Sequence, residues 1–391
     1  MEEGSSTSSK RRRDDADYAT TTLPQSTRRS ARHEKKKKHL YLALDDWNGG
    51  YSIHKLDADA ILYDDDDDAA GRRLPEPAAV RIASPAPRDY MSFAAVGTNI
   101  VIDTNPQCRH EHASPTLVYD TETSALTVGP HVPDGIHGLA DASMGAVGET
   151  LYALTSSFTL DKKISLQALS WAPTSIPDRY PWEPPMEWSW KATVDKDYTI
   201  PYHGKEVVGY ALHPDGRTIF VSSGVTTHTL DTSNGVWKDL GDWALPFRGQ
   251  AFFDPDLDAW VGLHRNRDNV NICCCPVASR STVVTSTRPM TPRCKVLREK
   301  LTRRKEGDTK YMFIRTGADV SLTYMGGGRF ALVEGILRSE DLLNDGAVIH
   351  VTLFGLQYDH NGDLQTKVRR ATRSYAVSKT TPFFSHAAFW M

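Results

Sequence analysis

The sequence predicts an all-β domain of the β-propeller type, preceded by a disordered basic tail. Three observations lead to this prediction. A two-strand pattern recurs five times, Asp-Gly and Gly-Gly dipeptides lie in the turns, and no amphipathic helical period competes with the strands. Such dipeptides suit the positive φ angles of tight hairpin turns. The length of 391 residues accommodates one large all-β domain.

Each repeat consists of an apolar strand, a tight turn and a second apolar strand. The turns fall at Gly97, Gly148, Gly216, Asp258 and Gly327. Their uneven spacing is close to the length of one four-stranded blade with its loops. A more polar pair of strands follows the hairpin, as the outer positions of a blade require.

The two ends of the domain predict one further blade. Residues 39–62 and 80–83 supply three strands, and residues 383–390 supply the innermost fourth. Pairing the two ends would close a ring and remove edges that invite aggregation. The prediction is six blades, and the alternative is five blades with the ends folded on as extras.

Residues 1–38 are predicted to be a disordered tail, and residues 39–391 the propeller. The tail holds eleven Lys and Arg against six Asp and Glu, a net charge of +5, which leaves −8 for the remainder of a chain whose total is −3. So polar a segment cannot offset its ordering entropy. Its basic clusters fit a nuclear-import signal, and the alternative is a solubilising tail. The candidate import residues are Lys10, Arg11, Arg12, Arg13, Arg28, Arg29, Lys35, Lys36, Lys37 and Lys38.

Two motifs resemble degenerate kelch repeats: Tyr119-Asp120-Thr121, and Leu230-Asp231-Thr232 with Trp237 downstream. The diglycine of a kelch repeat is missing. A wider resemblance begins at His39-Leu40-Tyr41-Leu42 and continues through Tyr51 to Lys55 toward the C-terminus. It is to a family of kelch-like proteins expanded in grasses and known as a domain of unknown function. The resemblance implies a propeller fold, a plant source and an intracellular location, and it supplies no catalytic residues.

The cysteines and histidines do not form a recognisable metal site. Cys273, Cys274 and Cys275 are consecutive. Adjacent residues of a strand point to opposite faces, so we expect buried free thiols, with only the first and third sharing a side. His110 and His112 lack a third ligand nearby, and the acidic run 64–68 is expected in a solvated loop. No catalytic, cofactor or metal residues are predicted.

An aromatic segment from Trp171 to Trp190 contains five prolines and is expected to be a stiff loop. Trp171, Tyr180 and Trp182 are the candidate partner-binding residues. Trp188 and Trp190 are expected to alternate on an outer strand and pack between blades. Residues 294–304 are predicted to be either a helix or a loop insertion.

The favoured function is a monomeric scaffold that presents propeller loops to a protein partner. One alternative is an enzyme with a site in the central channel, and another is a nuclear protein that contacts nucleic acid through its tail. The five cysteines are an odd number and favour a reducing compartment, nucleus or cytoplasm. No apolar stretch is long enough to cross a membrane.

Overall fold

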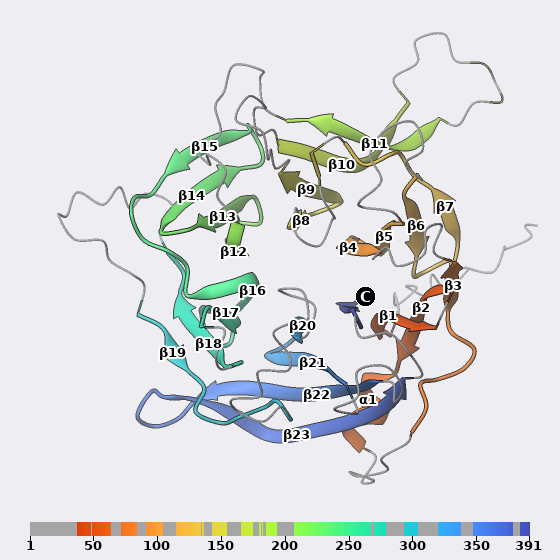
Figure 1. Cartoon of the computed structure of the whole chain (residues 1–391). Helices are drawn as coiled ribbons and strands as arrows, with labels where there is room; N and C mark the ends of the chain where they lie inside the picture. The colour runs from red at the N-terminus through yellow and green to blue at the C-terminus, as the bar shows by residue number, and fades with distance from the viewer. Residues whose placement is uncertain are drawn as a thin grey trace, which may run out of the picture. The chain divides into compact units, whose positions relative to one another are not determined.

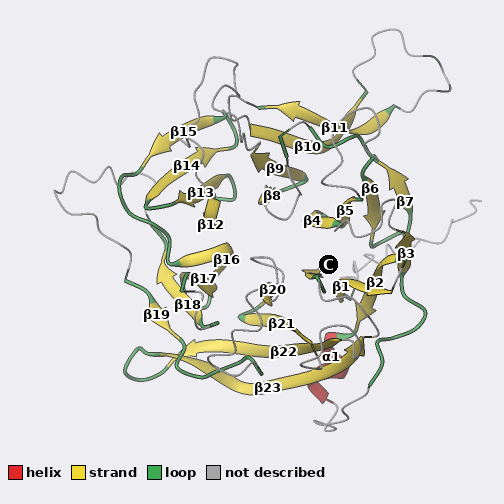
Figure 2. Ribbon diagram, viewed as in Figure 1, coloured by secondary structure: helices red, strands yellow, loops and turns green. Residues whose placement is uncertain are grey.

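The computed structural model describes residues 37–47, 49–63, 72–83, 91–104, 115–133, 135–136, 143–154, 166–174, 180, 182, 185–193, 207–266, 270–278, 293–303, 320–337, 347–377 and 384–391. Residues 38–391 form one of the two units into which the chain divides. Twenty-four strands and one short helix fall in the described part of this unit (Figure 2). The all-β class is therefore confirmed.

The strands group into four-stranded antiparallel units, and consecutive strands of each unit are hydrogen-bonded to one another. The first contains β24 (His386–Trp390), β1 (Leu40–Trp47), β2 (Gly50–Leu56) and β3 (Val80–Ala83). The second contains β4 (Ser92–Val96), β5 (Asn99–Asp103), β6 (Leu117–Asp120) and β7 (Leu126–Val128). The third contains β8 (Ser143–Val147), β9 (Thr150–Leu154), β10 (Leu166–Pro173) and β11 (Met186–Ala192).

The fourth unit contains β12 (Val207–Leu212), β13 (Thr218–Ser223), β14 (Thr226–Asp231) and β15 (Val236–Asp239). The fifth contains β16 (Phe247–Asp254), β17 (Ala259–His264), β18 (Ile272–Pro276) and β19 (Lys295–Val296). The sixth contains β20 (Val320–Gly326), β21 (Arg329–Leu337), β22 (Ala347–Tyr358) and β23 (Leu364–Val377).

Figure 1 shows these units arranged around a centre, with the first strand of each innermost and the last at the periphery. The innermost strands of successive units contact one another from β4 through to β20, and β20 contacts β24. Between the fourth and fifth units this contact becomes a parallel pair, β12 with β16, which joins these two units into one eight-stranded sheet. Gly209 permits the close approach, since a Cβ there would lie 2.5 Å from the carbonyl oxygen of Phe247. This arrangement is that of a β-propeller.

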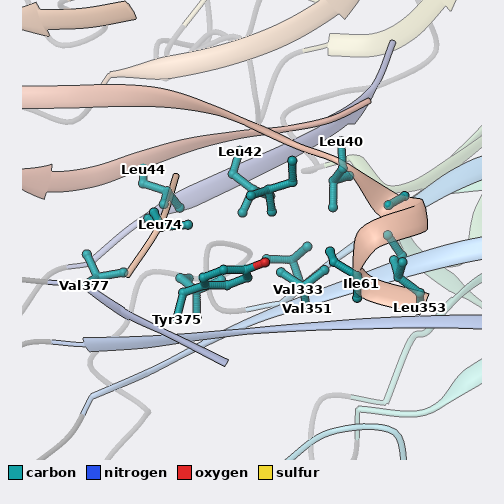
Figure 3. Close-up of a cluster of buried hydrophobic side chains, with 14 of the residues drawn as sticks. Leu40, Leu42, Leu44, Ile61, Leu74, Val333, Val351, Leu353, Tyr375 and Val377 are labelled. Carbon is teal, nitrogen blue, oxygen red and sulfur yellow. The ribbon is translucent and has the colours of Figure 1, made fainter. Parts of the chain in front are cut away.

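Six buried clusters lie one between each pair of neighbouring units, so the core is distributed around the ring. Figure 3 shows the cluster between the first and sixth units, where Leu40, Leu42 and Leu44 face Val333 and Val351. The cluster between the second and third units joins Val101 to Leu151 and Leu169. Because each cluster needs residues from two units, the units stabilise one another rather than fold as separate sheets.

The predicted pairing of the two ends is confirmed. Strand β24 pairs antiparallel with β1 from Leu40↔Trp390 to Leu44↔His386. The backbone of His39 also exchanges two hydrogen bonds with Met391. On the neighbouring side, the Thr323 hydroxyl donates to the Ala388 carbonyl at 3.0 Å. The last strand therefore joins the first unit to the sixth.

The two Asp-Thr motifs, Asp120-Thr121 and Asp231-Thr232, occupy equivalent places in the second and fourth units. At the end of β6, the Thr121 amide and hydroxyl both donate to the Thr98 carbonyl, at 3.0 and 2.7 Å. At the end of β14, Thr232 makes the same two bonds to the Arg217 carbonyl, at 3.0 and 2.8 Å. In each motif the aspartate accepts from the amide two residues later. The Asp-Thr pair thus ties the outer turn to the inner turn of its own unit.

Residues 39–62 and 80–83 supply the three expected strands, β1, β2 and β3, and the structure adds a helix that was not predicted, α1 (Ala58–Tyr63), after β2. The sequence signal for the start of this helix is Asp57. Its carboxylate accepts a hydrogen bond from the Asp59 amide at 3.0 Å, as that of an N-cap residue does. The helix alternative for residues 294–304 is wrong over the described residues, where β19 continues into irregular chain through residue 303.

Candidate functional site

The third unit carries the candidate site on its outer hairpin. Strands β10 and β11 pair along their length, and Trp171 lies directly opposite Trp188. Their ring centroids are 5.8 Å apart with the planes tilted by 58°. The sequence placed Trp171 in a stiff loop, but it lies on β10 because its backbone completes the ladder with β11.

The connection between the two strands holds the other two candidates. Its base is closed where the Thr174 amide donates to the Pro185 carbonyl at 3.2 Å. The rings of Tyr180 and Trp182 stack with centroids 4.7 Å apart and planes within 5° of parallel. Stacking of this kind fixes two large rings at a small cost in side-chain entropy, because each side chain has only two χ angles.

These three side chains are exposed. Trp171 is 47%, Tyr180 58% and Trp182 76% accessible to solvent. Of the nine tryptophans, Trp171 and Trp182 are the two that are exposed, and both lie on this hairpin. We call Trp171, Tyr180 and Trp182 the aromatic surface.

Trp188 lies beside Trp171 on the same face of the hairpin, and Trp188 and Trp190 hold the hairpin in place. Both are partly buried and pack against the cluster between the second and third units. This confirms the prediction that they lie on an outer strand and pack between units. Two tryptophans of one strand thus anchor the hairpin while its remaining aromatic rings face solvent.

The cysteine expectation is also confirmed. All three residues of the run are buried on β18. Cys273 and Cys275 face the cluster between the fourth and fifth units, and Cys274 faces the opposite side, toward the sixth. Burial, followed by the neighbouring cysteines, raises the pKa of the Cys273 thiol, which keeps it protonated and unreactive.

The described residues contain no group of three or more His, Cys, Asp or Glu side chains placed to hold a metal ion. His110, His112 and the acidic run 64–68 lie outside the described residues. No helix in the described part of the chain is long and apolar enough to cross a membrane. Of the candidate import residues only Lys37 and Lys38 are described, and both are exposed, so nuclear import stays a prediction.

Sequence reasoning assigned no role to the buried carboxyl groups, which among the described residues are those of Asp45, Asp103, Asp254 and Glu334. Asp254, at the end of β16, is the most deeply buried of them. Its Oδ1 accepts from the Asp256 amide at 2.8 Å and from the Leu257 amide at 3.4 Å. Burial raises its pKa, against the lowering effect of these two bonds. The sequence shows an aspartate at the end of this strand. Its burial could not be predicted, because it depends on packing against the sixth unit. The two hydrogen bonds of its carboxylate are those of a turn residue.

Comparison with known proteins agrees with the sequence resemblance at the level of the family. Residues 37–375 match the family model described as "Protein of unknown function (DUF1668)". The chain belongs to this family. The DUF1668 match spans the described strands from β1 to nearly the end of β23 and stops before β24. No functionally curated protein matches the sequence significantly.

Among solved structures, this DUF1668 chain is similar to TolB from Acinetobacter baumannii, with 12% identity, a TM-score of 0.45, and coverage of 90% of this chain and 66% of that one. It is also similar to a putative TolB from Agrobacterium tumefaciens, with 8% identity, a TM-score of 0.39, and coverage of 91% of this chain and 99% of that one. A third similar structure is the β-propeller domain of Cps50 (Swd1) from Myceliophteria thermophila, with 9% identity, a TM-score of 0.35, and coverage of 85% of this chain and 82% of that one. The propeller assignment rests on the sheet order of the chain itself.

Proposed function

We propose that this DUF1668 chain is a protein-interaction scaffold, a kelch-like propeller that binds a partner protein through its aromatic surface. The single observation that carries the proposal is the exposure of Trp171, Tyr180 and Trp182 on one hairpin. Tryptophan and tyrosine are enriched among the residues that dominate binding energy at protein interfaces. Exposed aromatic side chains gathered on one element favour an interaction site.

The scaffold is inferred to be a propeller of six blades. Six four-stranded units and six clusters between them support this count. The matched Asp-Thr hydrogen bonds of the second and fourth units support the kelch-like character. An experimental structure with five or seven radial sheets would contradict the blade count.

The two paired strands suit recognition because their ladder is formed before a partner arrives. The ladder from Gln167↔Ala192 to Pro173↔Met186 holds Trp171 in place, and the rings of Tyr180 and Trp182 already stack on each other. A preorganised surface loses less conformational entropy when it binds, so more of the contact energy appears as affinity.

The test compares the full chain with Trp182→Ala and Tyr180→Ala in the cells that normally make it. Proximity labelling identifies proteins that the wild-type chain labels and both variants do not. Each is then purified, and its affinity for the three chains is measured by calorimetry. Loss of one such ring at an interface costs about 2 kcal/mol, or roughly thirtyfold in affinity.

Val236→Ala is the matched control, because Val236 is an exposed apolar residue on another outermost strand, β15. It should leave the affinity unchanged. If every partner of the wild-type chain binds Trp182→Ala and Tyr180→Ala equally well, the aromatic surface is not the binding site.

A further inference from the structure

The outermost strand of the sixth unit differs from its counterparts in length and charge. Strand β23 has 14 residues, whereas β3, β7, β11, β15 and β19 have between two and seven. It contains Lys367, Arg369, Arg370 and Arg373 and no acidic residue. The domain as a whole has a net negative charge, whereas this strand has a net positive charge.

Basic residues from two other segments gather beside β23. On one side, the Arg370 guanidinium donates to the Lys300 carbonyl at 3.4 Å, which places Lys300 next to the strand. The segment then crosses the sheet to Arg303, whose amide donates to the Glu334 carboxylate of β21 at 2.7 Å. On the other side, Arg73 forms a parallel bridge with Ala376. We call Lys367, Arg370, Arg373, Lys300, Arg303 and Arg73 the basic edge.

Acidic neighbours offset only part of this charge. Glu299 pairs with Arg370 at 3.0 Å, and Asp363 pairs with Arg298 at 2.8 Å. Lys300, Arg303 and Lys367 are exposed and form no ion pair with any residue that the structure describes. The unneutralised charge therefore faces solvent.

The edge also offers backbone hydrogen bonds. The Ala376 amide donates to the Arg72 carbonyl at 2.8 Å, so it points away from β22. Because pairs alternate in an antiparallel ladder, the amides of Ser374 and Thr372 point outward as well. No other described segment pairs with this side of β23. Arg72 and Arg73 thus show how an extended chain adds to the edge.

We propose that the basic edge binds an extended acidic segment of a partner protein, which adds to β23 as a further strand. Carboxylates of the partner would pair with the lysines and arginines, and its backbone would use the outward amides and carbonyls. A nucleic acid fits less well, because phosphates only accept hydrogen bonds and would leave the outward carbonyls of the strand without donors.

The competing explanation is that these charges only protect the edge from aggregation, a known use of lysine and bulges on edge strands. The register of β22 and β23 does shift between Leu353 and Gly355. The two explanations differ in what they predict. Protection needs no ligand, whereas strand addition uses the backbone of β23, which is at least twice as long as any other outermost strand and offers a partner more pairing positions.

The test measures binding to the full chain by fluorescence anisotropy. The probes are a peptide that alternates glutamate and threonine, the same peptide with N-methyl groups on consecutive residues so that both of its edges are blocked, and a DNA single strand of equal charge. The edge variant is Lys300→Gln, Arg303→Gln and Lys367→Gln. The control variant is Lys55→Gln, Lys191→Gln and Lys238→Gln, with the same change in charge. Both variants retain the basic tail.

We expect the edge variant to bind the acidic peptide about tenfold more weakly and the control variant to bind it unchanged. N-methylation should weaken binding to the wild-type chain by a similar factor, since it removes backbone donors without changing charge. Equal losses in both variants, or equal affinity for the two peptides, would overturn strand addition at this edge.

Two other outcomes also count against the proposal. DNA that binds more tightly than the peptide and depends on the edge residues would assign the edge to nucleic acid. If light scattering shows that the edge variant self-associates while its affinity for the peptide is unchanged, the charges serve only to protect the edge from aggregation. Neither result bears on the aromatic surface, which the variants leave intact.

Discussion

The outer strands of the third and sixth units have the same place in the topology and opposite chemistry. Strand β11 packs Trp188 and Trp190 against the neighbouring unit, and its hairpin displays aromatic rings. Strand β23 buries Tyr375 and Val377 and displays lysine and arginine. The inner strands of both units supply the closed core. The periphery is therefore free to vary, and in this chain it carries two candidate surfaces of different chemistry.

The largest difference between the two strands should be in their contribution to stability. Tyr375 is 4% exposed in the cluster of Figure 3, so Tyr375→Ala should lower the free energy of unfolding by about 3–5 kcal/mol. Trp188 is only partly buried, and Trp188→Ala should cost roughly half as much. Urea denaturation measures both. Equal losses would mean that the two outer strands are held equally firmly.

A second difference should appear on acidification. Burial, and then the charge of Arg303, lower the pKa of His350, which pairs across the sheet with Ser374 of β23. Its folded-state pKa lies below the unfolded value of about 6.5. The unfolded chain then binds more protons, and stability contributed by the neutral imidazole is lost as the pH falls through that range.

Hydrogen exchange at neutral and mildly acidic pH should therefore show β22 and β23 losing protection before β10 and β11. The described residues of those two strands contain no histidine. His350→Gln should remove most of the pH dependence. A loss of protection that is uniform across both units would contradict a local role for His350.

The smallest expected effect concerns the ion pair of the basic edge. Glu299 is 40% exposed and bonds both Arg370 and the Thr366 hydroxyl, so Glu299→Gln should cost about 0.5 kcal/mol or less. Glu187→Gln on β11 is the matched control, since no ion pair involving Glu187 is found among the described residues. Thermal unfolding measures the loss of stability in each of the two variants. A cost above about 2 kcal/mol would show that Glu299 is a structural residue rather than a surface partner.

Much of the fold follows from local patterns. The hairpins at Gly97, Gly148, Gly216 and Gly327 lie where the alternation and turn residues predicted them. Glycine at these positions adopts positive φ, which other residues rarely tolerate. Such signals are contained in a few consecutive residues and can be found without knowledge of the tertiary structure.

The long hairpin of β22 and β23 was not predicted, and neither was the basic edge. Four basic residues and a register shift interrupt the apolar alternation of β23. Lys300 and Arg73 reach this strand from segments far away in the sequence. No spacing rule brings such residues together, because their proximity depends on how the sixth unit packs between the fifth and the first.

The sequence by itself determined most of the inner strands and their turns, the opposite faces of Cys273 and Cys274, and the pairing of the two ends. It also identified the aromatic residues of the candidate site. Only the tertiary structure decided that Trp171, which was expected in a loop, lies on β10. Trp171 and Trp188 lie opposite each other on one hairpin, yet Trp188 packs against the neighbouring unit while Trp171 faces solvent. Burial depends on what another part of the chain places beside a side chain, and local sequence does not contain that information.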